Sequence, residues 1–352
     1  MHRLNIGIAG AGLLGRLAAW TLSRQGHRVS VFDPAPGPQP RHDGQGAAGF
    51  TAAGMLSPLA ERETCEPDLA ERGWRSIARW QAISHELGQR HDPPPHFAAM
   101  GSLLVAHGPD LGSARRVLSR LWAPEVATPP ARPSGTGNTS APMAAAHSAR
   151  HPAVALDAAA LAALEPGLHS ASGPLHAWLL PGEAHIDTVR TLQCLHDDAS
   201  EVRWHWGRRV SAIGPGWLET ADGAAAADVG DPAPGSPGRA ATRHEVDWVL
   251  DLRGTGATDQ CPVRGVRGEM VWLHAPGTNL RRPVRLLHPR HRVYIVPRPD
   301  DVVLVGATEI ESEDRSPVSL RSAVELMAAA HSVLPALAEA RILKLDSNQP
   351  WR

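Results

Sequence analysis

The chain has 352 residues, of which 42% are hydrophobic and 20% are charged, a balance that is ordinary for a globular protein. Its length exceeds the limit of about 250–300 residues at which a single hydrophobic core stops growing, so we expect two lobes. The net charge of −1 argues against a nucleic-acid partner. The three cysteines are scattered, which argues against a disulfide or metal framework and favours a cytoplasmic location. No apolar run is long enough to cross a bilayer, which argues against a membrane span.

The first predicted element is a strand–turn–helix–strand unit. Residues 4–9 form a mostly apolar run, residues 16–25 have helical spacing, and residues 28–32 form a second apolar run that closes on Asp33. A helical crossover between two neighbouring strands implies that the strands are parallel. We therefore expect this unit to begin a parallel sheet.

The turn of this unit has the spacing of a dinucleotide-binding fingerprint. Gly10, Gly12 and Gly15 lie between the first strand and the helix. The first glycine permits a tight turn, the second lets a pyrophosphate approach the backbone, and the third lets helix and strand pack closely. Asp33 is placed to accept hydrogen bonds from ribose hydroxyls. The fingerprint predicts a bound dinucleotide and leaves FAD and NAD both open.

Further elements follow along the chain. A loop over residues 34–46 and a small apolar segment over 47–59 precede a helix predicted over 69–88. Two stretches dominated by Ala, Pro, Gly and Ser are predicted to be flexible surface insertions, 127–152 and 223–242. Helical spacing recurs at 157–164, 186–196 and 320–340, and apolar strand patterns occur at 246–252, 263–273, 292–297 and 301–305. We expect Asp187 to cap the helix that follows it.

Several segments carry motifs that resemble those of a known family. They are residues 46–56 (Gly-Ala-Ala-Gly-Phe-Thr-Ala-Ala-Gly-Met-Leu), 264–270 (Arg-Gly-Val-Arg-Gly-Glu-Met), 294–298 (Tyr-Ile-Val-Pro-Arg) and 305–309 (Val-Gly-Ala-Thr-Glu). Together with the fingerprint they resemble, in order and spacing, the FAD-dependent D-amino-acid oxidase family, and most closely its thiamine-biosynthetic glycine oxidases. The resemblance favours FAD, because a nicotinamide dehydrogenase has no role for the later motifs.

This resemblance implies an α/β fold with a Rossmann-like FAD-binding domain and a second, α+β substrate domain built on a mainly antiparallel sheet. The chain would pass twice through each domain. Residues 1–90 and 186–260 would form the FAD-binding domain, and residues 91–185 and 261–345 the substrate domain. Residues 346–352 would be an unmatched tail.

The resemblance also assigns site residues. The positions that match the family's FAD-binding residues are Gly10, Gly12, Leu13, Leu14, Gly15, Asp33, Ala52, Ala53, Gly54, Met55, Val210, Gly254 and Gly256. Tyr294, the only tyrosine, matches the family residue whose hydroxyl helps to hold the substrate carboxylate. Arg298 is expected to be structural. His288 and His291 either line the mouth of the pocket or lie in a solvated loop.

The implied reaction is the oxidative deamination of a small amino acid or secondary amine, of the glycine or sarcosine type. Hydride would pass to flavin N5, and oxygen would reoxidise the flavin to give hydrogen peroxide. The expected partners are therefore a small amine and oxygen, with no metal. Assembly into a homo-oligomer stays open.

The C-terminal motifs of the family have no match in this chain. The family continues with a "GxRP" strand whose arginine pairs with the substrate carboxylate. We therefore expect a C-terminally truncated member with weak or no oxidase activity. The alternative to an oxidase is a flavoprotein that only binds a partner, and release of hydrogen peroxide separates the two.

Overall fold

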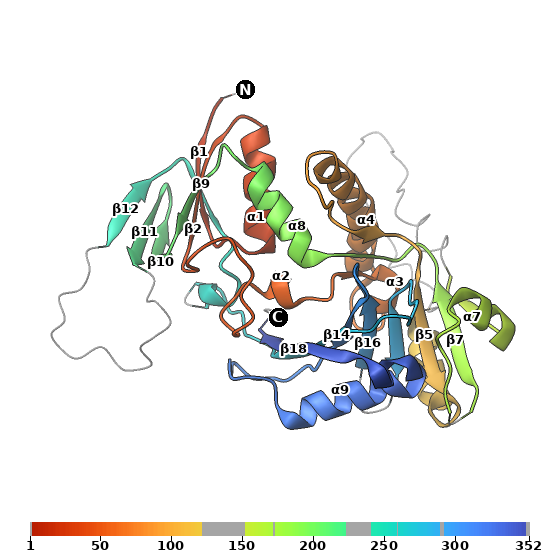
Figure 1. Cartoon of the computed structure of the whole chain (residues 1–352). Helices are drawn as coiled ribbons and strands as arrows, with labels where there is room; N and C mark the ends of the chain where they lie inside the picture. Colours follow the sequence, from red (N-terminus) through yellow and green to blue (C-terminus); the bar gives the residue numbers. More distant parts are fainter. Residues whose placement is uncertain are drawn as a thin grey trace, which may run out of the picture.

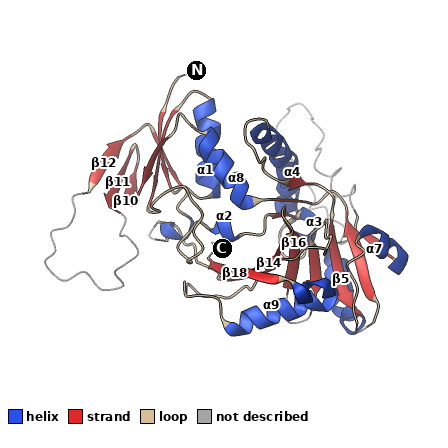
Figure 2. Cartoon of the chain, in the orientation of Figure 1, coloured by secondary structure: helices blue, strands red, loops and turns tan. Residues whose placement is uncertain are grey.

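The computed structural model describes residues 2–121, 152–171, 173–222, 241–258, 260–288 and 292–349. Two separate sheets, each with helices against it, dominate this part of the chain (Figures 1 and 2). In the described residues, no helix combines the length and the apolarity needed to span a bilayer.

The first sheet is parallel and has the order β13-β1-β2-β9. It is made of β1 (Asn5–Ala9), β2 (Arg28–Asp33), β9 (Arg203–Trp206) and β13 (Trp248–Asp251). Three helices cover one of its faces, α1 (Leu13–Arg24), α4 (Pro67–Gly88) and α8 (Thr188–Asp198). Alternate residues of the strands, such as Ile6 and Ile8, are buried against these helices together with Trp20 and Leu195. This is the predicted strand–turn–helix–strand unit, extended by two later strands.

The opposite face of the parallel sheet packs against a small antiparallel sheet. Its strands are β10 (Arg208–Gly214), β11 (Trp217–Asp222) and β12 (Thr242–Glu245). Phe32, Val210 and Leu218 form the buried contact between the two sheets. The parallel sheet is therefore covered on both faces, as parallel sheets usually are.

The second large sheet has eight strands in the order β18-β14-β17-β16-β15-β5-β7-β6. Their bounds are β5 (Ser102–His107), β6 (Val154–Leu156), β7 (Leu175–Leu180), β14 (Gly268–His274), β15 (Val284–Leu287), β16 (Arg292–Pro297), β17 (Val302–Gly306) and β18 (Arg341–Asn348). All neighbours are antiparallel except β15 and β5. The fold class is therefore confirmed: a Rossmann-like α/β part and a second part on a mainly antiparallel sheet.

The two faces of the eight-stranded sheet have different neighbours. One face packs on α9 (Leu320–Val333) and α7 (Ala158–Leu164) in the largest apolar core. The other face meets α2 (Ala48–Thr51), α3 (Pro58–Glu61) and α5 (Leu111–Leu121). A short sheet of β3 (Met55–Leu56), β8 (Ala184–Ile186) and β4 (Phe97–Ala98) lies where the chain crosses between the two parts. The candidate site residues converge on this second face.

Two sequence predictions are wrong at their ends. The helix predicted over 320–340 stops at Val333, and residues Pro335–Glu339 form a 3-10 turn because proline removes a hydrogen-bond donor and clashes with the preceding turn. The strand predicted over 263–273 begins only at Gly268. The two predicted insertions, 127–152 and 223–242, lie almost wholly outside the described residues.

Candidate active site

The glycine turn between β1 and α1 requires two of its three glycines for the fold itself. Gly10 has φ +99°, and a Cβ there would lie 2.5 Å from the carbonyl oxygen of Leu252. A Cβ on Gly15 would lie 1.9 Å from the carbonyl oxygen of Gly10. Both clashes are with backbone, which cannot move aside cheaply. These two glycines therefore set the shape of the turn.

Gly12 is different, because no such clash explains it. Its Cβ would meet a single atom within 4 Å, the Cβ of Ala47 at 3.7 Å. Gly12 is also the N-cap of α1, and no side chain caps this helix. Leu13 and Leu14 begin the helix, and Leu14 is half exposed. The start of α1 thus offers backbone N–H groups and partial positive charge beside open space, which is how helices bind phosphate.

Asp33 braces the same turn. Its two carboxylate oxygens accept hydrogen bonds from the backbone N–H of Ala11, at 2.7 Å, and of Ala35, at 2.8 Å. Each oxygen keeps a second lone pair for another donor. Asp33 is therefore at the predicted position, and it also fixes the backbone that the fingerprint requires.

Arg16 was not predicted as part of this region. Its guanidinium is buried and donates to the carbonyls of Ala11, Leu192 and Pro38 at 2.8–3.0 Å. Burial lowers the pKa of Arg16 to about 10, against the opposing effect of Asp33. The residue joins the turn, α8 and the loop after β2. No local pattern predicts this role of Arg16, because two of the three carbonyls come from outside its own turn.

Hydrogen bonds to its backbone carbonyl groups fix the segment from Ala52 to Met55. The hydroxyl of Thr188 donates to Ala52 at 2.9 Å, Arg298 donates to Ala53, and the N–H of Ile186 donates to Gly54 at 2.9 Å. Gly54 has φ +68°, and a Cβ there would lie 2.1 Å from the carbonyl oxygen of Ile186. The structural role predicted for Arg298 agrees with this contact.

A row of side chains crosses the sheet face toward which this segment packs. Paired positions on successive strands place Asp346, Met270, Gly306, Tyr294 and Arg285 side by side. A Cβ on Gly306 would lie 1.9 Å from the sulfur of Met270, so this glycine makes room for the methionine. The Tyr294 hydroxyl donates to that sulfur at 3.5 Å. Burial raises the pKa of Tyr294 to about 12, so its hydroxyl stays protonated.

The remaining predicted residues lie near the glycine turn or at helix ends. Val210 is buried in β10, and its carbonyl faces the Arg253 guanidinium at 3.5 Å. Gly254 and Gly256 belong to a 3-10 turn that follows β13. This turn begins two residues after Leu252, whose carbonyl Gly10 approaches. Asp187 caps α8 through the N–H of Arg190 at 3.1 Å. His288 is half-buried, and His291 lies outside the described residues.

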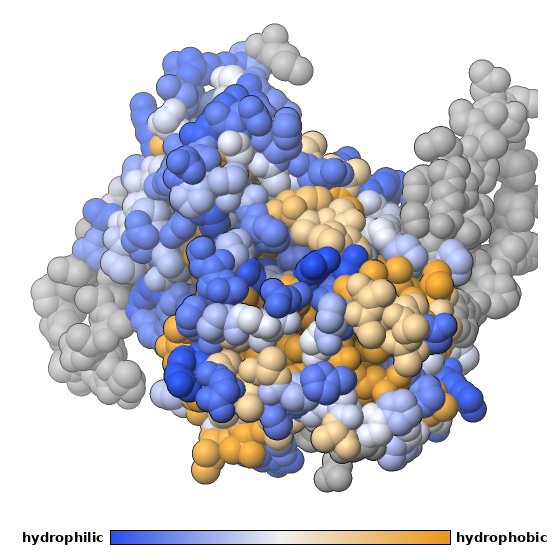
Figure 3. Space-filling model, turned by 45° about the vertical axis from the view of Figure 1, so that its right-hand side comes forward, coloured by the Kyte–Doolittle hydropathy of each residue, from blue (hydrophilic) through white to orange (hydrophobic). Residues whose placement is uncertain are grey.

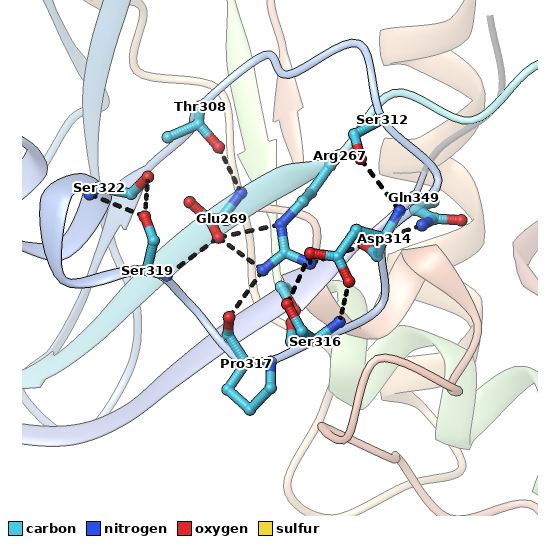
Figure 4. Close-up of polar contacts among 11 residues, drawn as sticks. Arg267, Glu269, Thr308, Ser312, Asp314, Ser316, Pro317, Ser319, Ser322 and Gln349 are labelled. Atoms are coloured by element: carbon cyan, nitrogen blue, oxygen red, sulfur yellow. Dashed lines mark hydrogen bonds and ion pairs between the residues drawn. The ribbon is translucent and has the colours of Figure 1, made fainter. Parts of the chain in front are cut away.

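The "GE" and "GAT" motifs meet in a structural network (Figure 4). Arg267 and Glu269 form a buried ion pair of 2.6 Å, and the hydroxyl of Thr308 accepts the N–H of Glu269 at 3.0 Å. Arg267 also donates to the carbonyls of Asp314 and Pro317. Arg267, Glu269 and Thr308 therefore anchor the loop before α9, whereas Met270 and Gly306 of the same motifs lie in the row that contains Tyr294.

Comparison with known proteins gives a consistent result. Residues 5–349 match the family model described as FAD dependent oxidoreductase, abbreviated DAO. Over 340 residues the chain is 33% identical to a protein of Rhizobium etli described as the thiamine biosynthesis oxidoreductase ThiO, covering 96% of this chain and 81% of the relative.

Solved structures share the fold. A glycine oxidase from Geobacillus kaustophilus superposes with a TM-score of 0.74 at 21% identity, covering 100% of this chain and 84% of the other. An iminodiacetate oxidase from Chelativorans sp. gives 0.69 at 22% identity, covering 98% and 83%.

Proposed function

Because the chain belongs to the DAO family of FAD-dependent oxidoreductases, we propose that it deaminates a small amino acid or secondary amine of the glycine or sarcosine type. When bound, FAD accepts the hydride that leaves the α-carbon, and oxygen takes up the electrons as hydrogen peroxide. The similarity to ThiO supports a place in thiamine biosynthesis, and we propose a cytoplasmic location.

The observation that supports this proposal best is the contrast among the three glycines. Gly10 and Gly15 are explained by backbone clashes, whereas the space in front of Gly12 is left open at an uncapped helix start. A diphosphate fits both the space and the partial positive charge. Both features support the proposed cofactor cradle at the start of α1.

We assign the cofactor's parts to residues as follows. The pyrophosphate would lie on residues 10–15, the ribose on Asp33, and the flavin along residues 52–55. The adenosine half would lie near Val210, Gly254 and Gly256, which border the same turn. We further propose the domain boundaries given above, with residues 1–90 and 186–260 in the FAD-binding part.

Tyr294 is the proposed catalytic-site residue. Its hydroxyl lies on the same sheet face as the side chains that pack on Ala53, so a substrate near the flavin segment could reach it. A phenol that stays protonated donates a hydrogen bond to a carboxylate without adding charge. Its role would be to orient the substrate so that the reacting C–H bond points toward the cofactor.

A binding role without catalysis is the second candidate. It keeps the cofactor cradle and requires no substrate oxidation. Hydrogen peroxide formed with glycine or sarcosine by the purified, FAD-loaded protein would exclude this candidate. If no small amine gives peroxide while FAD binds stoichiometrically, the oxidase proposal is wrong and the binding role stands.

The cradle itself is tested by replacing Gly12 with glutamate. The new carboxylate would enter the open space and repel the diphosphate, so we expect FAD affinity to fall at least about 100-fold. Apoprotein stability should change little, because no atom blocks the side chain. Gly37→Glu is the matched control, since it adds the same charge in open space in the loop after β2. Equal FAD affinity in the two variants would contradict the proposed cradle.

A further inference from the structure

Arg315, in the loop between β17 and α9, joins two separate segments of the parallel-sheet part. One terminal nitrogen of its guanidinium donates to the Gly44 carbonyl at 2.7 Å, and the other donates to the Thr255 hydroxyl at 3.3 Å. Gly44 belongs to the loop between β2 and α2, and Thr255 belongs to the 3-10 turn after β13. One side chain of the eight-stranded part therefore bridges a loop and a turn that lie far apart in sequence.

Both segments that Arg315 joins border the glycine turn. The loop leads into Ala47, whose Cβ lies 3.7 Å from the position of a Cβ on Gly12. The 3-10 turn follows Arg253, whose Cα lies 3.0 Å from the position of a Cβ on Gly10. Because the glycine turn is the proposed cradle for the diphosphate, the bridge ties together two segments that flank the cofactor site.

The backbone around Arg315 is fixed to the eight-stranded sheet. The side chains of Arg267 and Gln349 donate to the Asp314 carbonyl at 2.7 and 2.9 Å (Figure 4). The chain also packs closely on the loop, since a Cβ on Gly44, which has φ +75°, would lie 2.7 Å from the Arg315 carbonyl oxygen. Arg315 is therefore presented to the loop and the turn from a rigid support.

The loop between β2 and α2 has further attachments to the same sheet. His42 lies 2.6 Å from the buried carboxylate of Asp346, and Asn348 donates to the Gly46 carbonyl at 3.0 Å. These contacts keep the loop on β18 when Arg315 is replaced. Loss of Arg315 should therefore open the bridge between loop and turn without unfolding the loop.

We infer that Arg315 closes the cofactor site, so that its guanidinium must release Gly44 and Thr255 before FAD can enter or leave. Arg315 is then a positioning residue, because it acts through the loop and the turn. The inference rests on the cofactor site of the proposed function and is independent of which amine is oxidised. A bridge that is closed both in the free and in the FAD-bound protein stabilises the two states equally, so it slows exchange without changing affinity.

The rates of FAD binding and release test the bridge. Stopped-flow measurements of FAD fluorescence give both rates, on mixing the apoprotein with FAD and on diluting the loaded protein. Arg315→Ala should raise each rate about tenfold, roughly the effect of one hydrogen bond from a charged donor, while Kd changes less than about threefold. Arg321→Ala is the matched control, since this arginine is 83% exposed on α9, and it should leave both rates unchanged.

Two further replacements separate bridging from charge. Arg315→Lys keeps the charge but lacks the planar fork that reaches two acceptors, so both rates should match those of Arg315→Ala. Thr255→Val removes only the acceptor hydroxyl and should raise both rates several-fold, whereas Thr255→Ser should keep the rates of the parent. If Arg315→Lys restores the rates of the parent, Arg315 attracts the diphosphate directly and the inference is wrong.

The inference would also be overturned if Arg315→Ala changes neither rate, or if it raises only the release rate, so that affinity falls in proportion. Thermal melting of the apoprotein within a few degrees of the parent shows that a variant is folded, and Thr255→Val decides the question if Arg315→Ala is not. Amine oxidation by a protein whose variants exchange FAD at the parent's rates would contradict only the inference. Faster exchange in a protein that oxidises no amine would contradict only the proposed function.

Discussion

At the scale of single residues, Arg267 and Glu269 show what the motif before β14 does. Two guanidinium nitrogens donate to one carboxylate oxygen, at 3.0 and 2.6 Å, and both side chains are almost fully buried. The Arg267 guanidinium also holds the carbonyls of Asp314 and Pro317 in the loop that leads to α9. The pair therefore joins β14 to a segment about 50 residues later in the chain.

Removing one partner of this ion pair should destabilise the folded protein. We expect Glu269→Ala to lower the free energy of unfolding by about 3–5 kcal/mol, because the buried Arg267 guanidinium then keeps only the exposed carboxylate of Asp314, at 3.7 Å, as an ionic partner. Urea denaturation measures the change. The control is Glu325→Ala, whose partner Arg321 is 83% exposed, and it should cost at most about 1 kcal/mol. Equal losses in the two variants would show that the Arg267–Glu269 pair is not effectively buried.

Glu183 gives stability a dependence on pH. Burial raises its pKa to about 7 from an ordinary 4.5, although Arg285 and Ser102 act in the opposite direction. The folded protein therefore holds this proton more tightly than the unfolded chain does. Stability from Glu183 is complete below about pH 4.5 and is lost as the pH rises toward 7.

The variant Glu183→Gln isolates this effect. Gln keeps an acceptor for the backbone N–H of Ala60, which donates to Glu183 at 2.8 Å, and cannot lose a proton. The variant should therefore gain stability relative to the parent between about pH 4.5 and 8. The expected gain is on the order of 3 kcal/mol. Denaturation of both proteins across this range measures the gain. Burial lowers the pKa of His185 in β8 to about 3, so this residue also makes stability depend on pH, but its effect is common to both proteins. A constant difference at every pH would refute the raised pKa.

Whether a residue of the candidate site could be predicted from sequence depends on whether it belongs to a local pattern. Gly10, Gly15 and Asp33 could be predicted, because all three lie in one strand–turn–helix–strand unit with a recognisable spacing, although the Leu252 carbonyl that Gly10 approaches is far away in sequence. Arg285 could not, because its contacts with Ser57 and Glu61 span more than 220 residues. Nothing local distinguishes such an arginine from one on the surface. The later motifs marked Tyr294 but did not show that a cation stands beside it.

At the scale of elements, both ends of most helices were predicted to within about three residues, α9 being the exception, whereas the short strands were not predicted. Asp157, Asp187 and Ser319 each accept an N–H three residues ahead, the local pattern of an N-cap. The end of α9 was missed because the apolar stripe continues past Pro335. The two-residue strands β3 and β4 have no periodicity, so only long-range pairing defines them.

The cap of α8 also bears on the proposed flavin segment. Asp187→Ala should cost about 1 kcal/mol of stability through the lost cap. Because Thr188 in the first turn holds the Ala52 carbonyl, the same change should also weaken FAD binding. Asp157→Ala removes an equivalent cap from α7, which contacts β6 and β7, and should leave FAD affinity unchanged. Fluorescence titration measures the FAD affinity of the two variants. If Asp187→Ala and Asp157→Ala bind FAD equally tightly, α8 does not support the cofactor site.

At the scale of the whole molecule, β18 lies at one end of the eight-stranded sheet, and in the described residues its only strand partner is β14. Three apolar side chains on it are 41–54% exposed, Ile342, Leu343 and Leu345. Apolar surface is also visible among hydrophilic residues in Figure 3. An exposed apolar edge strand is a template for pairing with another chain.

Leu343→Lys should therefore reduce concentration-dependent aggregation without much change in the fold. A charge on an edge strand opposes pairing with a second copy, while a half-exposed position contributes little packing, so we expect the free energy of unfolding to change by less than about 0.5 kcal/mol. Light scattering against protein concentration measures the first effect. Val324→Lys places the same charge at a 53% exposed position on α9, away from any strand edge. If both variants reduce aggregation equally, exposed apolar area is the cause; if only Leu343→Lys does, strand pairing is.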